Sequence, residues 1–271
     1  MLALVTTIAL VQAQAPKTQT TRTLKKVTEL KMPNRSVDSM PGTRGACVAW
    51  HPVLRKYYAV FAGNMGYPLA VFDERSKRLS DNDLSAMIDT RGLWYDPATK
   101  LITGNAYSDY GWFTYKLNPK GIPADYVSTK DGMNQPNDQC VGVYNPVAKQ
   151  VLFLKGGQVY NYNKDAELLD SIAIHWGRKK ADGPADDEDR YSSPEDYNYT
   201  SLIFTGIKMQ ELGFLNTTNK EIDFYDLKTG YLTNKLALPE TAVVESSFNF
   251  AYANGIYWLF NIEDRKWVGY K

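Results

Sequence analysis

The sequence predicts a single all-β domain built from repeated units of four short antiparallel strands. Tyrosine, which favours strands and half-buried surfaces, is abundant, with 19 residues against 10 phenylalanines. One pattern of apolar runs and turns recurs at intervals of 45 and 49 residues. The chain has 271 residues and is 44% hydrophobic, so one large β domain can bury a substantial core.

The repeat is clearest in three segments: ACVAWHPVLRKYYAVFAGN from Ala46, GLWYDPATKLITGNAYS from Gly92 and CVGVYNPVAKQVLFLKGG from Cys140. Each holds an apolar strand that ends in an aromatic residue, then His, Asp or Asn before a proline, then a lysine and a second apolar strand. Asp-Pro and Asn-Pro begin tight turns, because proline presets φ at the second turn position. A third strand (69–73, 112–117, 159–163) and a fourth, as at 168–174, complete the unit.

Two less similar units follow. The fourth begins near Thr200 and runs to residue 238, and the fifth runs from 248 to 270 with an Asn-Gly hairpin turn at 254–255. The fifth unit stops one strand short. The segment TELKMPN at 28–34 can supply that strand, because it shares alternating apolar residues and a following proline with NKLALPE at 234–240. Closing the chain into a ring in this way removes exposed sheet edges.

Four short strands in roughly 45 residues are typical of a propeller blade. The arrangement resembles the β-propeller superfamily, including its closure by an N-terminal "velcro" strand, over about residues 22–271. The resemblance implies a five-bladed β-propeller with four antiparallel strands per blade, the last blade completed by the N-terminal strand. It identifies no single family within the superfamily. A six-bladed propeller and a β-sandwich are the alternatives.

The N-terminus predicts export. Residues 2–11 form an apolar run of signal-peptide length, and Ala-Gln-Ala at 13–15 matches a cleavage site, although no Lys or Arg precedes Lys17. We therefore expect a signal peptide at 1–15, a single propeller domain at 16–271, and a periplasmic or secreted protein without a membrane span. A buried N-terminal strand is the alternative. Cys47 and Cys140 fall on inner strands of non-adjacent units, so two buried thiols are expected rather than a disulfide.

The charge balance excludes some partners. With 31 basic and 30 acidic residues, the formal charge of +1 lacks the basic excess of phosphate-backbone binders, so nucleic acid is not expected as a partner. Two cysteines and two histidines cannot supply a recognisable zinc site. The acidic stretch at 181–195 is interpreted as a solvated loop, with calcium as an alternative, and no cofactor is predicted.

We label the strands of a blade a to d from the channel outward. In a propeller the d–a and b–c connections share one face, and here they are long; we call this the long-loop face, and the opposite one the short-turn face. Long loops on a rigid scaffold are the usual place for binding. The candidate ligand-binding residues on this face are Arg44, Arg91, Asn64, Asn105, Tyr107, Asp109, Tyr110, Trp112, Asp138, Glu195, Asp196 and Glu245.

The repeated residues have a functional and a structural interpretation. Thr-Arg-Gly precedes two inner strands, and the guanidinium groups of Arg44 and Arg91 suit a carboxylate, a sulfate or sugar hydroxyls unless acids such as Asp89 neutralise them. The Gly-Asn pairs at Asn64 and Asn105 either bind ligand or satisfy backbone groups.

Two loops combine aromatic and polar residues. The loop NAYSDYGW at 105–112 holds two tyrosines and a tryptophan beside a carboxylate, and PEDYNY at 194–199 has a similar mixture. Exposed aromatic faces beside amide and carboxylate groups suit sugar rings or peptide side chains. The alternative is that the aromatic residues pack against the neighbouring blade.

Hydrolysis of glycosides needs a paired acid and base, for which Asp138, Glu195, Asp196 and Glu245 are the candidates. Some five-bladed propellers of the arabinanase-like glycosidases work in this way. Their pattern places an Asp on the first inner strand, whereas RGACVAW at 44–50 has no carboxylate. The sequence therefore favours a non-catalytic binding protein for a glycan, a peptide or an envelope protein. A glycoside hydrolase or lyase, and a structural partner in an envelope assembly, are the alternatives.

Overall fold

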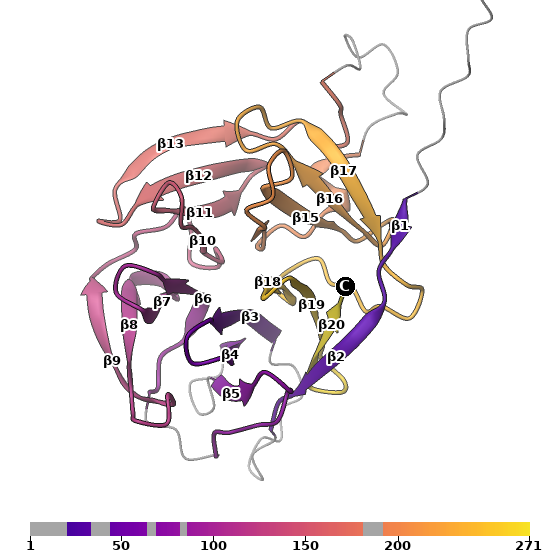
Figure 1. The fold of residues 1–271 in the computed structure, drawn as a ribbon. Helices are drawn as coiled ribbons and strands as arrows, with labels where there is room; N and C mark the ends of the chain where they lie inside the picture. Colours follow the sequence, from indigo (N-terminus) through magenta and orange to yellow (C-terminus); the bar gives the residue numbers. More distant parts are fainter. Residues whose placement is uncertain (1–20, 34–43, 64–68, 82–85, 181–191) are drawn as a thin grey trace, which may run out of the picture.

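Five antiparallel sheets surround a central channel, and the chain visits them in order (Figure 1). The structure is a computed structural model that describes residues 21–33, 44–63, 69–81, 86–180 and 192–271. The innermost strands contact one another in the cycle β3, β6, β10, β14 and β18, and β18 then contacts β3. This closed cycle confirms the five-bladed β-propeller. Neither a sixth blade nor a sandwich occurs in the described ranges.

The blades take their strands in sequence order from the channel outward, except that N-terminal strands lie at the outer edges of the fourth and fifth blades. The first blade holds β3 (Arg44–His51), β4 (Lys56–Ala62) and β5 (Leu69–Asp73). The second holds β6 (Thr90–Asp96), β7 (Leu101–Ala106), β8 (Trp112–Leu117) and β9 (Pro123–Lys130). The third holds β10 (Val143–Asn145), β11 (Gln150–Lys155), β12 (Gln158–Asn163) and β13 (Leu168–Ala173). The fourth holds β14 (Ile203–Phe204), β15 (Leu212–Asn216), β16 (Glu221–Tyr225) and β17 (Leu232–Ala237). The fifth holds β18 (Phe250–Ala253), β19 (Ile256–Asn261), β20 (Lys266–Tyr270) and β2 (Lys26–Lys31).

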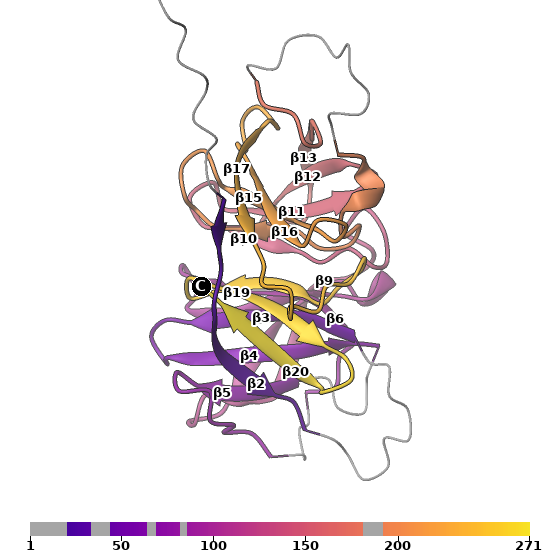
Figure 2. The same ribbon diagram turned by 90° about the vertical axis from the view of Figure 1, so that its right-hand side faces the viewer.

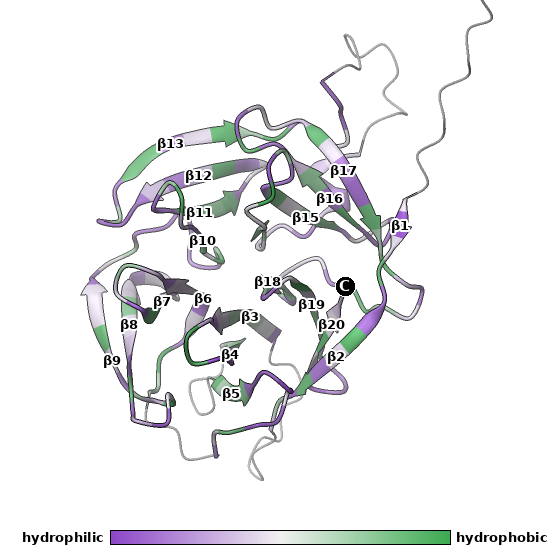
Figure 3. Ribbon diagram, viewed as in Figure 1, coloured by the Kyte–Doolittle hydropathy of each residue, from purple (hydrophilic) through white to green (hydrophobic). Residues whose placement is uncertain are grey.

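The fourth position of the first blade is abbreviated. In the described residues it consists of one bridge between Phe72 and Arg78, supported by a hydrogen bond of 2.8 Å from the Leu79 amide to the Val71 carbonyl. Elsewhere the outer strands are complete: β9 and β13 are mostly exposed and β17 is mostly half-buried, and each mixes hydrophobic and hydrophilic residues (Figure 3). The outer strands therefore form the water-facing edges of the blades.

The N-terminal strand closes the ring, as predicted. β2 pairs antiparallel with β20, with Leu30 opposite Trp267, and the two lie side by side at the edge of the fifth blade (Figure 2). A further contact was not predicted: β1 (Arg22–Thr23) pairs in parallel with β17 of the fourth blade. The N-terminal segment therefore joins the outer edges of two neighbouring blades.

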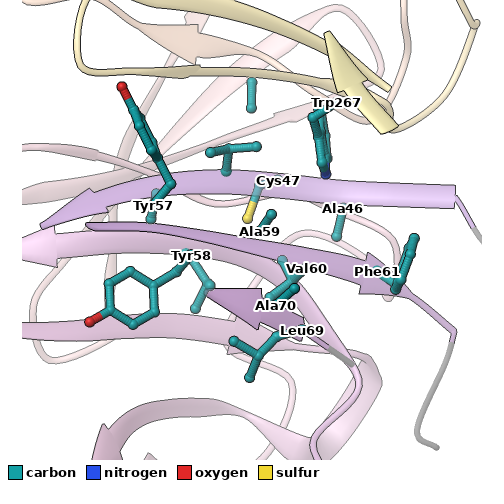
Figure 4. Packing of buried hydrophobic residues seen from close by; sticks show 14 of the residues in the cluster. Ala46, Cys47, Tyr57, Tyr58, Ala59, Val60, Phe61, Leu69, Ala70 and Trp267 are labelled. Carbon is teal, nitrogen blue, oxygen red and sulfur yellow. The ribbon is translucent and has the colours of Figure 1, made fainter. Parts of the chain in front are cut away.

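The core lies between the blades. One buried cluster links the second and third blades, another the third and fourth, another the fourth and fifth, and the largest joins the fifth, first and second. Figure 4 shows the last of these, where Trp267 of the fifth blade reaches the inner strand of the first near Ala46. A Cβ at Gly45 would stand 2.5 Å from the Trp267 ring, so glycine is required for this close approach.

Both cysteines are buried free thiols, as expected. Cys47 lies in the cluster of Figure 4, and Cys140 lies between the second and third blades. Burial raises the pKa of the Cys140 thiol to about 12 and that of Cys47 further still. Neither thiol is ionised near neutral pH, so both act as small apolar side chains.

The turns between inner and second strands follow the repeat. Each of the first three ends in a basic residue with left-handed backbone, Arg55, Lys100 and Lys149, at φ of 53°, 60° and 57°. The hairpin of the fifth blade turns at Asn254 and Gly255, whose φ values are 55° and 71°. Two successive positive φ angles are what an Asn-Gly hairpin turn requires.

Candidate functional site

The loops of the long-loop face contact one another around the end of the channel. The Gly63 amide, from a b–c loop, donates to Asp89 Oδ1 at 2.8 Å, and Asp89 belongs to the next d–a connection. On the other side of the ring, the Asp196 carbonyl accepts from the Thr217 amide at 2.7 Å. Each of these bonds joins a b–c loop to a d–a connection, so the two kinds of loop meet on the same face.

Arg91 is buried and engaged within the protein. Its exposed fraction is 4%, its guanidinium makes two hydrogen bonds to the Asp89 carboxylate, and its Nε donates to Gln139 Oε1 at 3.0 Å. The guanidinium carbon also lies 4.6 Å from the centre of the Tyr107 ring and 5.6 Å from that of Phe248. These contacts assign Arg91 a structural role and match the alternative in which Asp89 neutralises it.

The contact between Arg91 and Phe248 also links two blades that are not adjacent. Arg91 belongs to the second blade and Phe248 to the connection that enters the fifth, and these blades are not neighbours in the ring. The two side chains therefore bridge the second and fifth blades on the long-loop face. Arg44, the other arginine of the repeated tripeptide, is exposed and donates to Ser247 Oγ at 2.8 Å.

Buried asparagines join neighbouring blades at this level. Asn105 accepts from the Gly142 amide at 3.0 Å and donates to the Cys140 carbonyl at 2.9 Å. Asn249 accepts from the Gly45 amide at 2.7 Å, and Asn198 donates to the Phe248 carbonyl at 2.8 Å. Asn105 thus satisfies backbone groups rather than facing a ligand. Asn64 lies outside the described residues.

Most of the aromatic loop at 105–112 packs inward. Trp112 is 3% exposed, donates its indole N–H to the Asn134 carbonyl at 3.1 Å, and packs against Trp94. Tyr107 lies against Arg91. In the short helix η1 (Ser108–Tyr110), Asp109 is exposed and the Tyr110 ring is 54% exposed. The loop therefore presents one aromatic ring to solvent rather than a platform of three.

The four candidate carboxylates have different surroundings. Asp196 closes the capping box of the short helix η3 (Pro194–Asp196): its Oδ2 accepts from the Ser193 amide at 2.8 Å and its Oδ1 from Thr218 Oγ1 at 2.8 Å. Glu195 is exposed, and its carboxylate accepts from the Ser193 hydroxyl. Asp138 and Glu245 are half-buried. Asp196 is thus occupied in holding the loop, which leaves Glu195 directed to solvent.

A cleft of about 510 Å³ opens on this face between the third and fourth blades. Its walls come from the β11–β12 hairpin, from the connection between these two blades, and from the loop before β18. The lining residues are Leu154, Gly156, Gly157, Trp176, Pro194, Glu195, Tyr197, Asn198, Tyr199 and Ser246. Of the predicted candidates, the structure brings Glu195 to this cleft. Trp176, which the repeat alignment does not cover, was missed.

The aromatic walls of the cleft are fixed from behind. The half-buried Trp176 ring packs against Tyr197 and Phe214, with ring centres 4.4 and 5.1 Å apart. The Tyr199 amide donates to the Ser246 carbonyl at 2.9 Å, while 60% of the Tyr199 residue remains exposed. At Gly157, φ is +79° and a Cβ would stand 3.2 Å from Trp176 Nε1, so glycine is needed at this edge.

A buried carboxylate that the sequence reasoning missed lies behind the cleft. Asp223 is fully buried, and its Oδ2 accepts from the Tyr197 hydroxyl at 2.6 Å and lies 3.4 Å from Lys235 Nζ. Its Oδ1 has no hydrogen-bond partner among the described residues. Burial raises the pKa of Asp223, against the lowering effects of Tyr197 and Lys235. The available signal was a carboxylate in the middle of the apolar strand EIDFY.

The raised pKa of Asp223 predicts a pH effect on stability. The folded state holds the Asp223 proton more tightly than the unfolded state, so its contribution to stability is present at low pH. That contribution is lost as the pH rises from the ordinary value of 3.8 through the folded pKa. Urea unfolding of the protein and of Asp223→Asn, from pH 4 to 8, measures it. We expect the unfolding free energy of the protein to fall relative to that of the variant as the pH increases. A constant or rising difference would contradict the raised pKa.

The histidines lie away from this cleft or take part in packing. His51 is buried in a turn of the short-turn face, where Nδ1 accepts from the Leu54 amide at 3.2 Å. His175 stacks on Tyr231 with ring centres 4.0 Å apart. In the described ranges no three His, Cys, Asp or Glu side chains gather in a group that could hold a metal ion. The acidic segment 181–191 lies outside those ranges.

Comparison with known proteins assigns no family. Neither the protein-family models nor the curated proteins contain a match to this sequence. In the parts of the chain that the structure describes, no helix is long and apolar enough to span a bilayer.

Proposed function

We propose that the protein is an exported, non-catalytic binding protein and that it binds an oligosaccharide in the cleft between the third and fourth blades. The observation that carries the proposal is the combination of Trp176, Tyr199 and Glu195 in one cleft on the long-loop face. Aromatic faces suit the apolar faces of sugar rings, and a carboxylate accepts hydrogen bonds from hydroxyl groups. A cleft of about 510 Å³ falls within the range of small-ligand sites.

The surroundings of the cleft favour binding over hydrolysis. Asp196, which neighbours Glu195, holds the loop through its capping box. The fully buried Asp223 lies behind Tyr197 and does not line the cleft. An enzyme would need a second carboxylate facing the sugar across from Glu195. We therefore propose binding without hydrolysis, and the experiment below also detects glycoside hydrolysis if it occurs.

Calorimetric titration with neutral oligosaccharides of hexose and N-acetylhexosamine units tests the proposal. We expect at least one to bind, and Tyr199→Ala to weaken binding about 2- to 13-fold, the loss expected from one aromatic contact. Tyr110→Ala is the matched control, because its ring is similarly exposed on the same face, 54% against 60%, but does not line the cleft. Binding by Tyr110→Ala should equal that of the unaltered protein.

Three results would overturn the proposal. If no oligosaccharide binds, or if both tyrosine variants lose affinity equally, the cleft is not a glycan site. If new reducing ends accumulate during incubation and Glu195→Gln abolishes their release, the protein is a glycoside hydrolase and the non-catalytic assignment is wrong.

A further inference from the structure

A second cavity, of about 350 Å³, lies in the central channel and opens on the short-turn face. Its inner wall is formed by apolar residues of the inner strands, among them Cys47, Leu93, Val141, Leu202 and Phe250. Its mouth lies among the turns that follow these strands, at Pro52, Pro146, Gly206 and Asn254. The cavity is therefore on the opposite side of the ring from the cleft described above.

Each blade contributes one aromatic side chain to the mouth of this cavity. These residues are Trp50, Tyr95, Tyr144, Phe204 and Tyr252. All five are half-buried, whereas most residues of the inner strands are fully buried. In the first three blades the aromatic residue stands two positions before the turn proline, so this arrangement arises from the repeat itself. We call these five residues the aromatic cluster.

The lining of the cavity determines the chemistry of its ligand. Among the described residues that line it, none is charged, and polar side-chain groups come from Thr205, Asn254, the tyrosine hydroxyls, the indole N–H groups of Trp50 and Trp94, and the Cys47 thiol. Outside the mouth, Val53 and Val147 are exposed by 66% and 89% on two of the turns. A charged group inside would lose its hydration without a partner, which is unfavourable. An uncharged, largely apolar ligand fits, with its polar groups toward the mouth.

The residues that line the cavity place its mouth among the turns of the short-turn face. On the opposite face, Arg91 contacts Phe248 between blades that are not neighbours, and buried asparagines join neighbouring blades. We therefore expect a ligand to enter from the short-turn face and to contact the apolar inner wall. The volume of about 350 Å³ exceeds the roughly 150 Å³ of an apolar cavity that accommodates benzene, so a ligand of two or three rings can be enclosed.

We infer that the central cavity is a binding site for a small, uncharged aromatic compound, held by the aromatic cluster of the short-turn face. The proposal does not depend on the function proposed for the long-loop face. The two sites have different walls and different preferred ligands, because the cleft offers a carboxylate and the cavity offers no charge.

Titration with N-phenyl-1-naphthylamine, an uncharged aromatic probe whose emission rises in apolar surroundings, tests the inference. We expect saturable binding with one site per chain. Tyr144→Ala removes one residue of the aromatic cluster and should weaken binding about 2- to 13-fold. Val143→Phe adds bulk to the lining and should weaken it further. Tyr199→Ala, on the other face, should leave probe affinity unchanged, which separates this site from the glycan cleft.

Thermal unfolding of each variant shows whether it folds. If Val143→Phe does not fold, Tyr144→Ala alone tests the inference. The inference is overturned if the probe does not saturate, or if Tyr144→Ala binds it as tightly as the unaltered protein. It is also overturned if Tyr199→Ala, rather than Tyr144→Ala, removes the binding, because the probe would then occupy the cleft.

Discussion

Replacing Arg91 with methionine is expected to lower the free energy of unfolding by about 3–5 kcal/mol, the cost of breaking a buried ion pair by removing one partner. The carboxylate of Asp89 would remain in a nearly buried position without its guanidinium partner. The packing of Arg91 against Tyr107 and Phe248 would also change. Urea unfolding at neutral pH measures the loss.

Arg44→Met is the matched control for this prediction. Both arginines stand in the tripeptide Thr-Arg-Gly before an inner strand, but Arg44 is exposed and donates a hydrogen bond to Ser247 Oγ. Its replacement should change the unfolding free energy by less than about 1 kcal/mol. Combining Arg91→Met with Asp89→Asn should cost less than the sum of the single changes, because the pair acts as a unit. Additive and small effects would indicate that Arg91 is free for a ligand.

The contrast between the two arginines was present in the sequence. Residues two apart in an extended segment point to the same side, so Asp89 and Arg91 lie together in the segment DTRG. The residue two before Arg44 is Gly42, which offers no charge. This spacing predicts an ion pair with a neighbouring carboxylate, and hence a structural role, for Arg91 but not for Arg44.

The fold was more predictable than the site because it depends on a repeated local pattern. The turn prolines and the aromatic residues before them recur in three blades, and the Asn-Gly pair defines a fourth turn. The closing strand was also predictable, because its alternating apolar residues match another outer strand. The pairing of β1 with β17 could not be foreseen from Arg22–Thr23, which carries no apolar pattern.

The cleft depends on segments that no repeat relates. Trp176 follows the last strand of the third blade, and Tyr199 precedes the first strand of the fourth, so they meet only when the two blades pack. Trp112 shows the opposite case: the sequence predicts it both as the start of a strand and as a ligand-binding residue of the loop at 105–112, and as the first residue of β8 it packs between blades. Sequence reasoning found the long-loop face, and blade packing determined which of its aromatic residues stay accessible.

Closure of the ring by the N-terminal strand gives the second large effect. Leu30→Ala should lower the unfolding free energy by about 2–5 kcal/mol, since Leu30 is fully buried in the cluster that joins the fifth, first and second blades. The loss should also free β2 from β20 and expose a strand edge, so limited proteolysis should cut residues 22–31 faster in the variant.

Val27→Ala on the same strand is the control for closure. Val27 is 51% exposed and lies at an irregularity in the pairing with β20, so its replacement should change the unfolding free energy by about 0.5 kcal/mol or less. A large difference between the two variants means that stability depends on the apolar side chain that β2 inserts between the blades. Equal and small effects would mean that the Leu30 side chain adds little to the stability of the ring, and the pairing of β2 with β20 would then serve mainly to protect the edge of β20.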